Sequence, residues 1–308
     1  MRNACKEAVL RLMQQDQNVM LLAADGHDFV SQIPAGHECQ FVDYGIAESN
    51  MIASAAGLAA CGKRPFLFAV TNFMAMRGFE FLRDMVCIPR YPVTFIGFFS
   101  GMARGSWGTT HHGTEDLAIL RSLPHLTVVT PATPYEAKAA VEWGYHQCEA
   151  VYIRIEAGHE REYLPEEYAF EAGKGIVLRD GEHGTLVVVG SILSEAMQVA
   201  ERLDQEGIHL RVIDMPTVRP VDEELILSSA EKTRNIFTLE ESTIYGGLGS
   251  AVAEVLAESD CDVRFQRLGL KDFATGCGSQ QEMREQNEID SISIYKAIRN
   301  LLGKADLA

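Results

Sequence analysis

The chain has 308 residues, of which 47% are hydrophobic and 23% charged, the balance of an ordinary globular protein. Its 27 basic and 43 acidic residues give a formal net charge of −16, which excludes a basic surface for nucleic acid or for an anionic membrane. No apolar run approaches the roughly 18 residues of a membrane span, so we expect no membrane contact.

The N-terminal segment, residues 1–15, mixes charged with apolar side chains and has no continuous signal-peptide core. The seven cysteines are odd in number and scattered, without a CxxC pair, which argues against a disulfide framework and against a zinc site. We therefore expect reduced thiols and a cytoplasmic location.

In the first half of the chain, short β-rich apolar runs alternate with longer amphipathic segments. Strands are predicted at residues 19–24, 39–45, 65–70, 93–99, 126–131 and 151–156, and helices at 4–15, 49–61 and 135–148. The strands show little polar alternation, which is typical of parallel strands that helices cover on both faces. The alternation predicts an α/β domain with three layers, α/β/α, and a mostly parallel sheet.

Residues 156–175 interrupt this rhythm, because they are rich in charge, proline and glycine and lack helical periodicity. We interpret them as an interdomain linker, with one domain at 1–160 and a second, smaller α/β/α domain at 176–308. In the second domain, strands are predicted at 185–191, 210–216, 235–241 and 263–269, helices at 194–207, 250–259 and 291–304, and a loop between 216 and 235.

The sharpest local signal is Glu48, which follows the strand that ends at Gly45 and precedes a helix of small residues. Small side chains allow a flat ligand or another backbone to approach the helix closely. The alternative interpretation is structural: an acidic residue in the first turn complements the helix dipole.

Two further patterns follow at the ends of predicted strands. Phe73, Met76 and Phe79 stand at a spacing of three, which predicts one face of a helix and is compatible with core packing alone. A glycine-rich loop then leads to His111 and His112, and its glycines allow backbone to approach a ligand closely. Adjacent histidines point in different directions, so we expect them to line a cleft rather than to bind a metal.

The order of these motifs resembles the C-terminal half of transketolases and of deoxyxylulose-phosphate synthase. The motifs are AES-NM-AAGLAACG at 47–62, TNF-MRGFE at 71–80, GTTHHGTEDLAILRSLPHLTVVTPATPYEA at 108–137 and EESTIYGGLGSAVAEVL at 240–256. The resemblance extends from Met1 to Leu302. It implies a pyrimidine-binding domain followed by a transketolase C-terminal domain, with thiamine diphosphate as cofactor.

The resemblance also implies roles for individual residues. A glutamate at the position of Glu48 hydrogen-bonds N1′ of the cofactor's aminopyrimidine and promotes loss of the proton at the thiazolium C2, so Glu48 is expected to be catalytic. Phe73, Met76 and Phe79 match positions that stack on the pyrimidine, where Met76 replaces a residue that is commonly aromatic. His111 matches a histidine that contacts the donor hydroxyls and the reacting group, which predicts a catalytic and substrate-binding role.

The expected substrate-binding residues besides His111 are Ser100, Trp107, His112 and Arg154. Arg154 matches an arginine that binds substrate phosphate, and a surface ion pair with Glu156 is the alternative. Trp107 replaces an aspartate that reads the stereochemistry of the donor sugar, and Ser100 replaces a basic residue for the acceptor phosphate. We therefore expect the reaction class to be retained and leave the substrates unassigned.

The second half of the cofactor site is missing from the sequence. Related enzymes hold Mg²⁺ and the diphosphate through a GDG motif and a spaced asparagine, whereas this chain has only ADG at 24–26 and RDG at 179–181, without the unit that should follow. No metal ligand is therefore expected in this chain. We expect a diphosphate-binding N-terminal partner subunit that supplies the Mg²⁺ ligands, and a homodimer of this chain within an α2β2 assembly.

The leading interpretation is the C-terminal (β) subunit of a split transketolase that transfers a two-carbon ketol or related acyl unit between small carbonyl substrates. The alternatives are the β subunit of the first component of a 2-oxo acid dehydrogenase and a catalytically silent assembly subunit. The segment GGLGSAVAEV at 246–255 imitates a dinucleotide-binding turn, but Val252 replaces its third glycine or alanine. A tight turn that packs a helix on its strand is the favoured interpretation.

Overall fold

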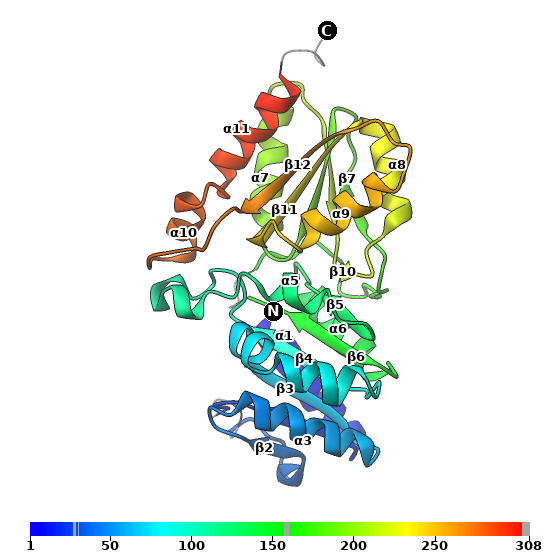
Figure 1. The fold of residues 1–308 in the computed structure, drawn as a ribbon, viewed down its shortest axis with the longest axis vertical. Coiled ribbons are helices and arrows are strands. Elements are labelled where there is room, and N and C mark those ends of the chain that lie inside the picture. Colours follow the sequence, from blue (N-terminus) through cyan, green and yellow to red (C-terminus); the bar gives the residue numbers. More distant parts are fainter. Residues whose placement is uncertain (27–28, 30, 157–159, 304–308) are drawn as a thin grey trace.

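The computed structural model describes residues 1–26, 29, 31–156 and 160–303. Two α/β domains follow each other along the longest axis of the molecule, the first from blue to green and the second from yellow-green to red (Figure 1). The N-terminus lies between them: the amino group of Met1 pairs with the carboxylate of Glu160, 2.6 Å away in the connecting segment. The predicted fold class, two α/β/α domains, is confirmed.

The first domain is built on a seven-stranded sheet in the order β10-β5-β6-β4-β3-β1-β2. Its strands are β1 (Val19–Ala23), β2 (Phe41–Asp43), β3 (Arg64–Val70), β4 (Thr94–Phe98), β5 (Leu126–Val129), β6 (Ala150–Arg154) and β10 (Thr217–Arg219). The six strands β1 to β6 pair with their neighbours in parallel, whereas β10 pairs antiparallel with β5. The apolar runs of β1, β3, β4, β5 and β6 are largely buried, as expected for parallel strands between helices, whereas the edge strand β2 is not.

Helices cover the two faces of this sheet unequally. Helices α1 (Arg2–Gln15) and α6 (Pro134–Tyr145) pack on one face. The other face is covered by α3 (Glu48–Ala60), α5 (Asp116–Leu120) and the chain from Phe73 to Cys87, which contains two π-helical segments and the short α4 (Phe79–Phe81). This second face carries the candidate site.

The second domain has a five-stranded sheet in the order β12-β11-β8-β9-β7. The strands are β7 (Ile176–Arg179), β8 (Gly184–Val189), β9 (Leu210–Asp214), β11 (Asn235–Thr243) and β12 (Arg264–Leu270), and the helices are α7 (Leu193–Asp204), α8 (Glu223–Thr233), α9 (Leu248–Ala257), α10 (Gln280–Gln286) and α11 (Ser291–Leu302). Helices α7, α10 and α11 pack on one face, and α8 and α9 on the other. The core under α8 and α9 is continuous with the core under α3 and α5, so apolar packing crosses the domain boundary.

The segment predicted as a loop between 216 and 235 was interpreted wrongly. It contains β10, which belongs to the second half by sequence but completes the first sheet, and α8, whose N-cap Asp222 accepts a hydrogen bond from the backbone of Leu225 (3.0 Å). The cap and the buried Ile226 and Ala230, four residues apart, were local signals for α8. No comparable signal exists for the three residues of β10, because only the pairing with β5 makes them a strand.

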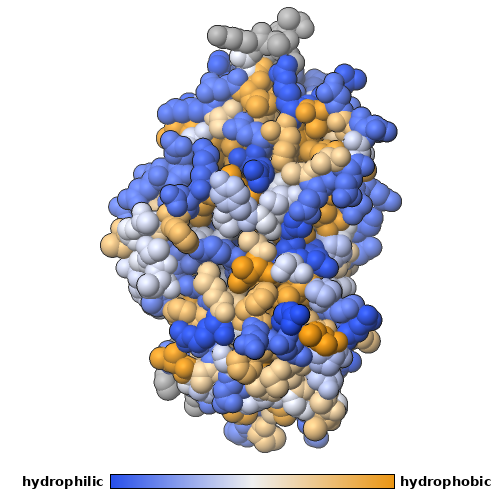
Figure 2. Space-filling view, in the orientation of Figure 1, coloured by the Kyte–Doolittle hydropathy of each residue, from blue (hydrophilic) through white to orange (hydrophobic). Residues whose placement is uncertain are grey.

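Figure 2 shows that apolar residues are frequent on the half of the molecule that the first domain forms, whereas the flanks of the second domain are mostly hydrophilic. Exposed large apolar side chains in the first domain include Val42, Ile46, Met76, Met85 and Ile88. Within the described part of the chain, the helices are too short or too polar to traverse a lipid bilayer.

Candidate active site

The candidate site lies at the carboxyl ends of parallel strands, where open α/β sheets bind their ligands. Glu48 follows β2, Phe73 follows β3, and the loop of residues 101–113 follows β4. This glycine-rich loop closes on itself, because Gly101 and Gly113 exchange backbone hydrogen bonds of 2.7 and 2.9 Å. The sheet order β4-β3-β1-β2 therefore brings segments that are far apart in sequence to one edge.

Glu48 is the first residue of α3, and its side chain is only 3% exposed. Its Oε2 accepts a hydrogen bond from Nη1 of Arg77 at 2.7 Å, while the side chain of Arg77 remains 50% exposed. A buried carboxylate needs such a partner, since an unpaired charge away from water is costly. One end of the site is thus an ion pair between a buried carboxylate and a half-exposed guanidinium.

A row of rings continues from this ion pair into the glycine-rich loop. The guanidinium of Arg77 lies 5.0 Å from the ring centroid of Phe73, and the Phe73 ring meets His111 edge to face at 5.2 Å. His111 in turn meets Trp107 edge to face at 5.1 Å. Glu48, Phe73, His111 and Trp107, which the sequence analysis named separately, therefore line one continuous surface.

Arg104 extends the row and was missed by the sequence analysis. Its guanidinium lies 4.1 Å from the ring centroid of Phe99 and 4.9 Å from that of Trp107. Among the described residues, none gives the Arg104 side chain a hydrogen bond or an ion pair, and its Nε is buried without a partner. A sequence signal existed, because Arg104 is the only Lys or Arg within the glycine-rich loop.

The comparisons with known proteins agree with this geometry. Residues 1–159 match the family model "Transketolase, pyrimidine binding domain", and residues 173–294 match "Transketolase, C-terminal domain". The chain belongs to the transketolase family. The resemblance that the motifs predicted is thereby confirmed for both domains.

Individual relatives match nearly the whole chain. One subunit of the apulose-4-phosphate transketolase of Phocaeicola vulgatus is 31% identical over 98% of this chain and 97% of its own length. 1-Deoxy-D-xylulose-5-phosphate synthase 1 of Geobacter metallireducens is 35% identical over 96% of this chain and 48% of its own length. A solved structure described as a split gene transketolase, inactive beta4 tetramer, superposes with a TM-score of 0.89 at 33% identity and covers 98% of this chain and 97% of its own.

The spacing predicted that Phe73, Met76 and Phe79 share one face of a helix, and this prediction is wrong. Phe73–Arg77 is a π-helical segment, in which hydrogen bonds span five residues, so residues three apart no longer share a face. Phe73 faces His111, Met76 is 44% exposed and Phe79 packs against the hydrophobic core. Of the three, Met76 is exposed, and Phe73 and Phe79 are both partly buried.

Arg154 requires a correction, since the structure places it neither in the cleft nor at the surface. Its side chain is about 1% exposed, and its Nε lies 3.1 and 3.0 Å from the two carboxylate oxygens of Asp116. Its Nη2 donates to the carbonyls of Gly113 and Glu241, both at 3.0 Å. Arg154 therefore ties the glycine-rich loop to the second domain, and both the phosphate contact and the surface ion pair with Glu156 are wrong.

His112 and Ser100 also lie inside the protein rather than on the cleft surface. The His112 ring is buried, with Nδ1 2.8 Å from the carbonyl of Ala274 and Nε2 3.4 Å from that of Gly105, so it links the loop to the second domain. The Ser100 hydroxyl is buried and finds no hydrogen-bond partner among the described residues. Neither side chain reaches a substrate in this arrangement.

The backbone N–H groups of the glycine turn before α9 bind a carboxylate of the protein itself. The buried Glu240 carboxylate accepts hydrogen bonds from the backbone of Leu248 (3.0 Å) and Gly249 (2.8 Å) and from the Ser242 hydroxyl (2.7 Å). A Cβ at Gly247 would lie 1.9 Å from Glu240 Oε2, so glycine is needed for this close approach. An internal carboxylate at this helix N-terminus leaves no place for a pyrophosphate, in agreement with the tight-turn interpretation.

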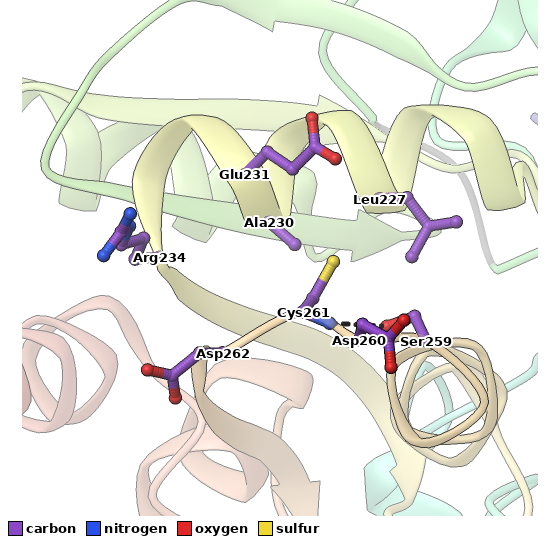
Figure 3. A pocket seen from close by; sticks show the side chains of 8 residues that line it. All are labelled: Leu227, Ala230, Glu231, Arg234, Ser259, Asp260, Cys261 and Asp262. Carbon is purple, nitrogen blue, oxygen red and sulfur yellow. Dashed lines mark hydrogen bonds between the residues drawn. The ribbon is translucent and has the colours of Figure 1, made fainter.

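A cavity of about 490 Å³ lies between α8 and the loop that follows α9 (Figure 3), and none of the candidate site residues lines it. It is lined by Leu227, Ala230, Glu231, Arg234, Ser259, Asp260, Cys261 and Asp262. Its three carboxylates and one guanidinium would repel an anionic ligand such as a diphosphate. Nowhere in the described chain do three histidine, cysteine or acidic side chains gather in a way that could hold a metal ion.

Proposed function

We propose that this chain is the β subunit of a split transketolase and that the assembled enzyme transfers a two-carbon ketol unit between a ketose donor and an aldehyde acceptor. The observation that carries the proposal is the buried Glu48 carboxylate at the start of α3, on one surface with Phe73 and His111. The family membership of both domains supports the reaction class.

The residues of this surface fit the pyrimidine half of thiamine diphosphate. Glu48 offers a buried carboxyl group, which suits a hydrogen bond to the ring nitrogen N1′, and Phe73 and Met76 offer flat or adaptable apolar contacts. When bound, the cofactor supplies the carbon nucleophile for ketol transfer. Glu48 would hold or release a proton at N1′, and the ring would exclude water from this carboxyl.

His111 and Trp107 would form the substrate side of the same surface. The Nδ1 of His111 is 3.1 Å from the Thr110 hydroxyl, and the ring is held between Phe73 and Trp107. A histidine fixed in this way can donate a hydrogen bond to a donor hydroxyl or accept one. Trp107, which is 49% exposed, would narrow the cleft beside it.

We further propose that the substrates carry an anionic group and that Arg104 contacts it. Arg154 is already paired with Asp116, whereas Arg104 has no carboxylate partner in the described structure. Trp107 lies between Arg104 and His111 and contacts both. Stacking on Phe99 and Trp107 leaves the terminal Nη–H groups, unlike the buried Nε–H, for an acceptor in the guanidinium plane. The name of the relative from Phocaeicola vulgatus, which specifies a phosphate ester, agrees with such a substrate.

The partner would be a second chain that binds the diphosphate and Mg²⁺. The relative from Phocaeicola vulgatus is itself one subunit of a transketolase, and the solved split transketolase is an inactive tetramer of β chains, which suits a β chain that needs a partner for activity. Val42 and Ile46 precede α3 in the chain and Met76 is next to Arg77, and these exposed apolar side chains would be covered in an assembly. We expect an α2β2 complex with a homodimer of this chain at its centre.

The test is reconstitution. The chain is mixed with its purified partner, Mg²⁺ and thiamine diphosphate, and ketol transfer from a ketose to an aldose is followed, with each of the two chains alone as control. Transfer by the mixture and by neither chain alone supports the proposal. Reduction of a lipoyl domain without ketol transfer would instead identify a 2-oxo acid dehydrogenase component, and inactivity in both assays would indicate a silent assembly chain.

A further inference from the structure

The Glu48–Arg77 ion pair joins a buried carboxylate that cannot move to a half-exposed guanidinium that can. Glu48 is fixed in the first turn of α3 and buried, whereas half of the Arg77 side chain lies in solvent at the end of a π-helical segment. The ion pair therefore has one permanent member and one replaceable member. Such an asymmetry is not needed for stability, because a carboxylate could be paired by a buried residue, as Asp116 is.

The guanidinium makes two contacts at once. It donates a hydrogen bond to Glu48 through Nη1 (2.7 Å), and it lies against the ring of Phe73 at 5.0 Å from the centroid. A guanidinium is planar, with donors at its edge and flat faces above and below. These are the same two contacts, an edge on Glu48 and a face on Phe73, that the proposed function assigns to the aminopyrimidine. Two planar groups cannot make both contacts simultaneously.

The backbone of Arg77 is held firmly while its side chain is not. The Ser49 hydroxyl, one residue after Glu48, donates to the Arg77 carbonyl at 3.1 Å. At the next position, a Cβ on Gly78 would come within 2.3 Å of the Ile52 side chain and 2.6 Å of the Met74 carbonyl, so the chain here packs directly on α3. The side chain thus starts from an anchored position and can leave Glu48 by rotating into solvent.

We propose that Arg77 is a positioning residue that occupies the pyrimidine position in the free chain, holds the Glu48 side chain there, and is displaced when the cofactor binds. The inference rests on the proposed function only for the identity of the incoming ring. In the free chain Arg77 satisfies a carboxylate that would otherwise be buried without a partner. In the assembled enzyme its departure frees Glu48 to share a proton with the ring nitrogen. Arg77 thereby weakens cofactor binding by the free chain.

The test uses the isolated full-length chain and thiamine, which carries the aminopyrimidine without the diphosphate. Calorimetric titration compares the parent with Arg77→Ala, and Arg83→Ala is the matched control because Arg83 is an equally exposed cation on the following π-helical segment. We expect Arg77→Ala to bind thiamine at least about tenfold more tightly than the parent, since no internal group competes for Glu48. Arg83→Ala should bind like the parent.

Two further arms separate competition from a structural effect. Methylguanidinium, added at constant ionic strength, should weaken thiamine binding to Arg77→Ala by refilling the vacated position, and should have little effect on the parent. In a Glu48→Gln background, which keeps the shape but removes the charge that holds Arg77, the substitution Arg77→Ala should change the affinity much less. Arg77→Lys, which keeps the charge but not the planar face, should fall between parent and alanine variant.

Equal or weaker thiamine binding by a folded Arg77→Ala chain overturns the proposal, as does insensitivity of that variant to methylguanidinium. If Arg77→Ala does not fold, Arg77→Lys decides in its place, and parent-like affinity of the lysine variant is then the contrary result. Failure of the proposed function looks different: the reconstituted complex would transfer no ketol unit while the thiamine and methylguanidinium results held.

Discussion

Two charged regions of this molecule use arginine and glutamate in opposite ways. In the cleft, Glu48 is paired with a half-exposed Arg77, next to the exposed Trp107 and to Arg104, which has no carboxylate partner among the described residues. At the junction of the two domains, every charged member is buried: Arg284 lies 2.5 Å from Glu241, 3.4 Å from Glu195 and 3.5 Å from Glu156. Charges that can exchange partners mark the site, and charges that cannot do so hold the domains together.

The domain junction also carries more negative than positive charge. Gln280 donates to Glu156 (2.6 Å) and Glu241 (3.0 Å), but one guanidinium faces three carboxylates. Burial, and then the negative charge of Glu241, raise the pKa of Glu156 to about 7, although Arg284 opposes the shift. At the end of β9, burial and then the negative charge of Glu162 raise the pKa of Asp214 to about 8. Protonation of Glu156 and Asp214 lowers the repulsion between buried carboxylates and so stabilises this part of the molecule.

The largest expected effect is a loss of catalysis in the cleft without a loss of stability. Glu48→Gln keeps the shape and a hydrogen bond but cannot exchange a proton, so kcat of the reconstituted complex should fall by roughly 10²–10⁴-fold. The midpoint of thermal unfolding should change little, because the substitution leaves no unpaired buried charge. Steady-state kinetics and calorimetry on the same preparation check both statements. A kcat close to the parent value would reduce Glu48 to a residue that complements the helix dipole.

Arg154→Ala should lower the free energy of unfolding rather than weaken a substrate contact. Removing one member of a buried ion pair leaves Asp116 unpaired, which typically costs about 3–5 kcal/mol. Denaturant unfolding should show this loss. The control is Arg90→Ala, which removes the exposed pair with Glu149 (3.5 Å) and should cost at most about 1 kcal/mol. A stable Arg154→Ala chain with a raised KM only for phosphorylated substrates would restore Arg154 to the substrate site.

The pH dependence of stability sharpens the comparison. Because the folded pKa of Glu156, about 7, lies above its ordinary value of 4.5, its stabilising contribution is complete below pH 4.5 and is lost as the pH rises through 7. The loss amounts to about 3 kcal/mol for this group at a neutral to alkaline pH. Glu156→Gln should flatten the fall in unfolding free energy between pH 5 and 8, leaving the contribution of Asp214. An unchanged pH profile in that variant would contradict the assignment.

The smallest expected effect concerns Arg104. A hydrogen bond to a charged acceptor contributes about 1.5–3 kcal/mol, so Arg104→Met should raise KM for a phosphorylated acceptor by roughly tenfold or more. KM for the same acceptor without phosphate should be almost unchanged, and kcat should be little affected. Initial rates of the reconstituted complex with the two acceptors measure the ratio. Equal changes for both acceptors would assign Arg104 to packing on Phe99 and Trp107.

Local patterns in the amino-acid sequence were enough to predict most of the strands and the family. Short β-rich runs identified ten of the described strands, and in most of them the residues are buried along the strand and show little polar alternation. The ordered motifs identified the family, and Glu48 was recognisable because it stands between a strand and a helix of small residues. These signals depend on neighbours within a few residues, so they are present before the chain folds.

Which side chains face the cleft depends instead on contacts between distant segments. Arg154 is turned inward by Asp116 and by the carbonyl of Glu241, 87 residues away, and His112 by the carbonyl of Ala274, 162 residues away. The strand β10 exists only because β5 pairs with it, and Arg77 meets Glu48 across 29 residues of chain. Burial and partner choice are properties of surfaces assembled in the folded molecule, whereas periodicity and capping are properties of one segment.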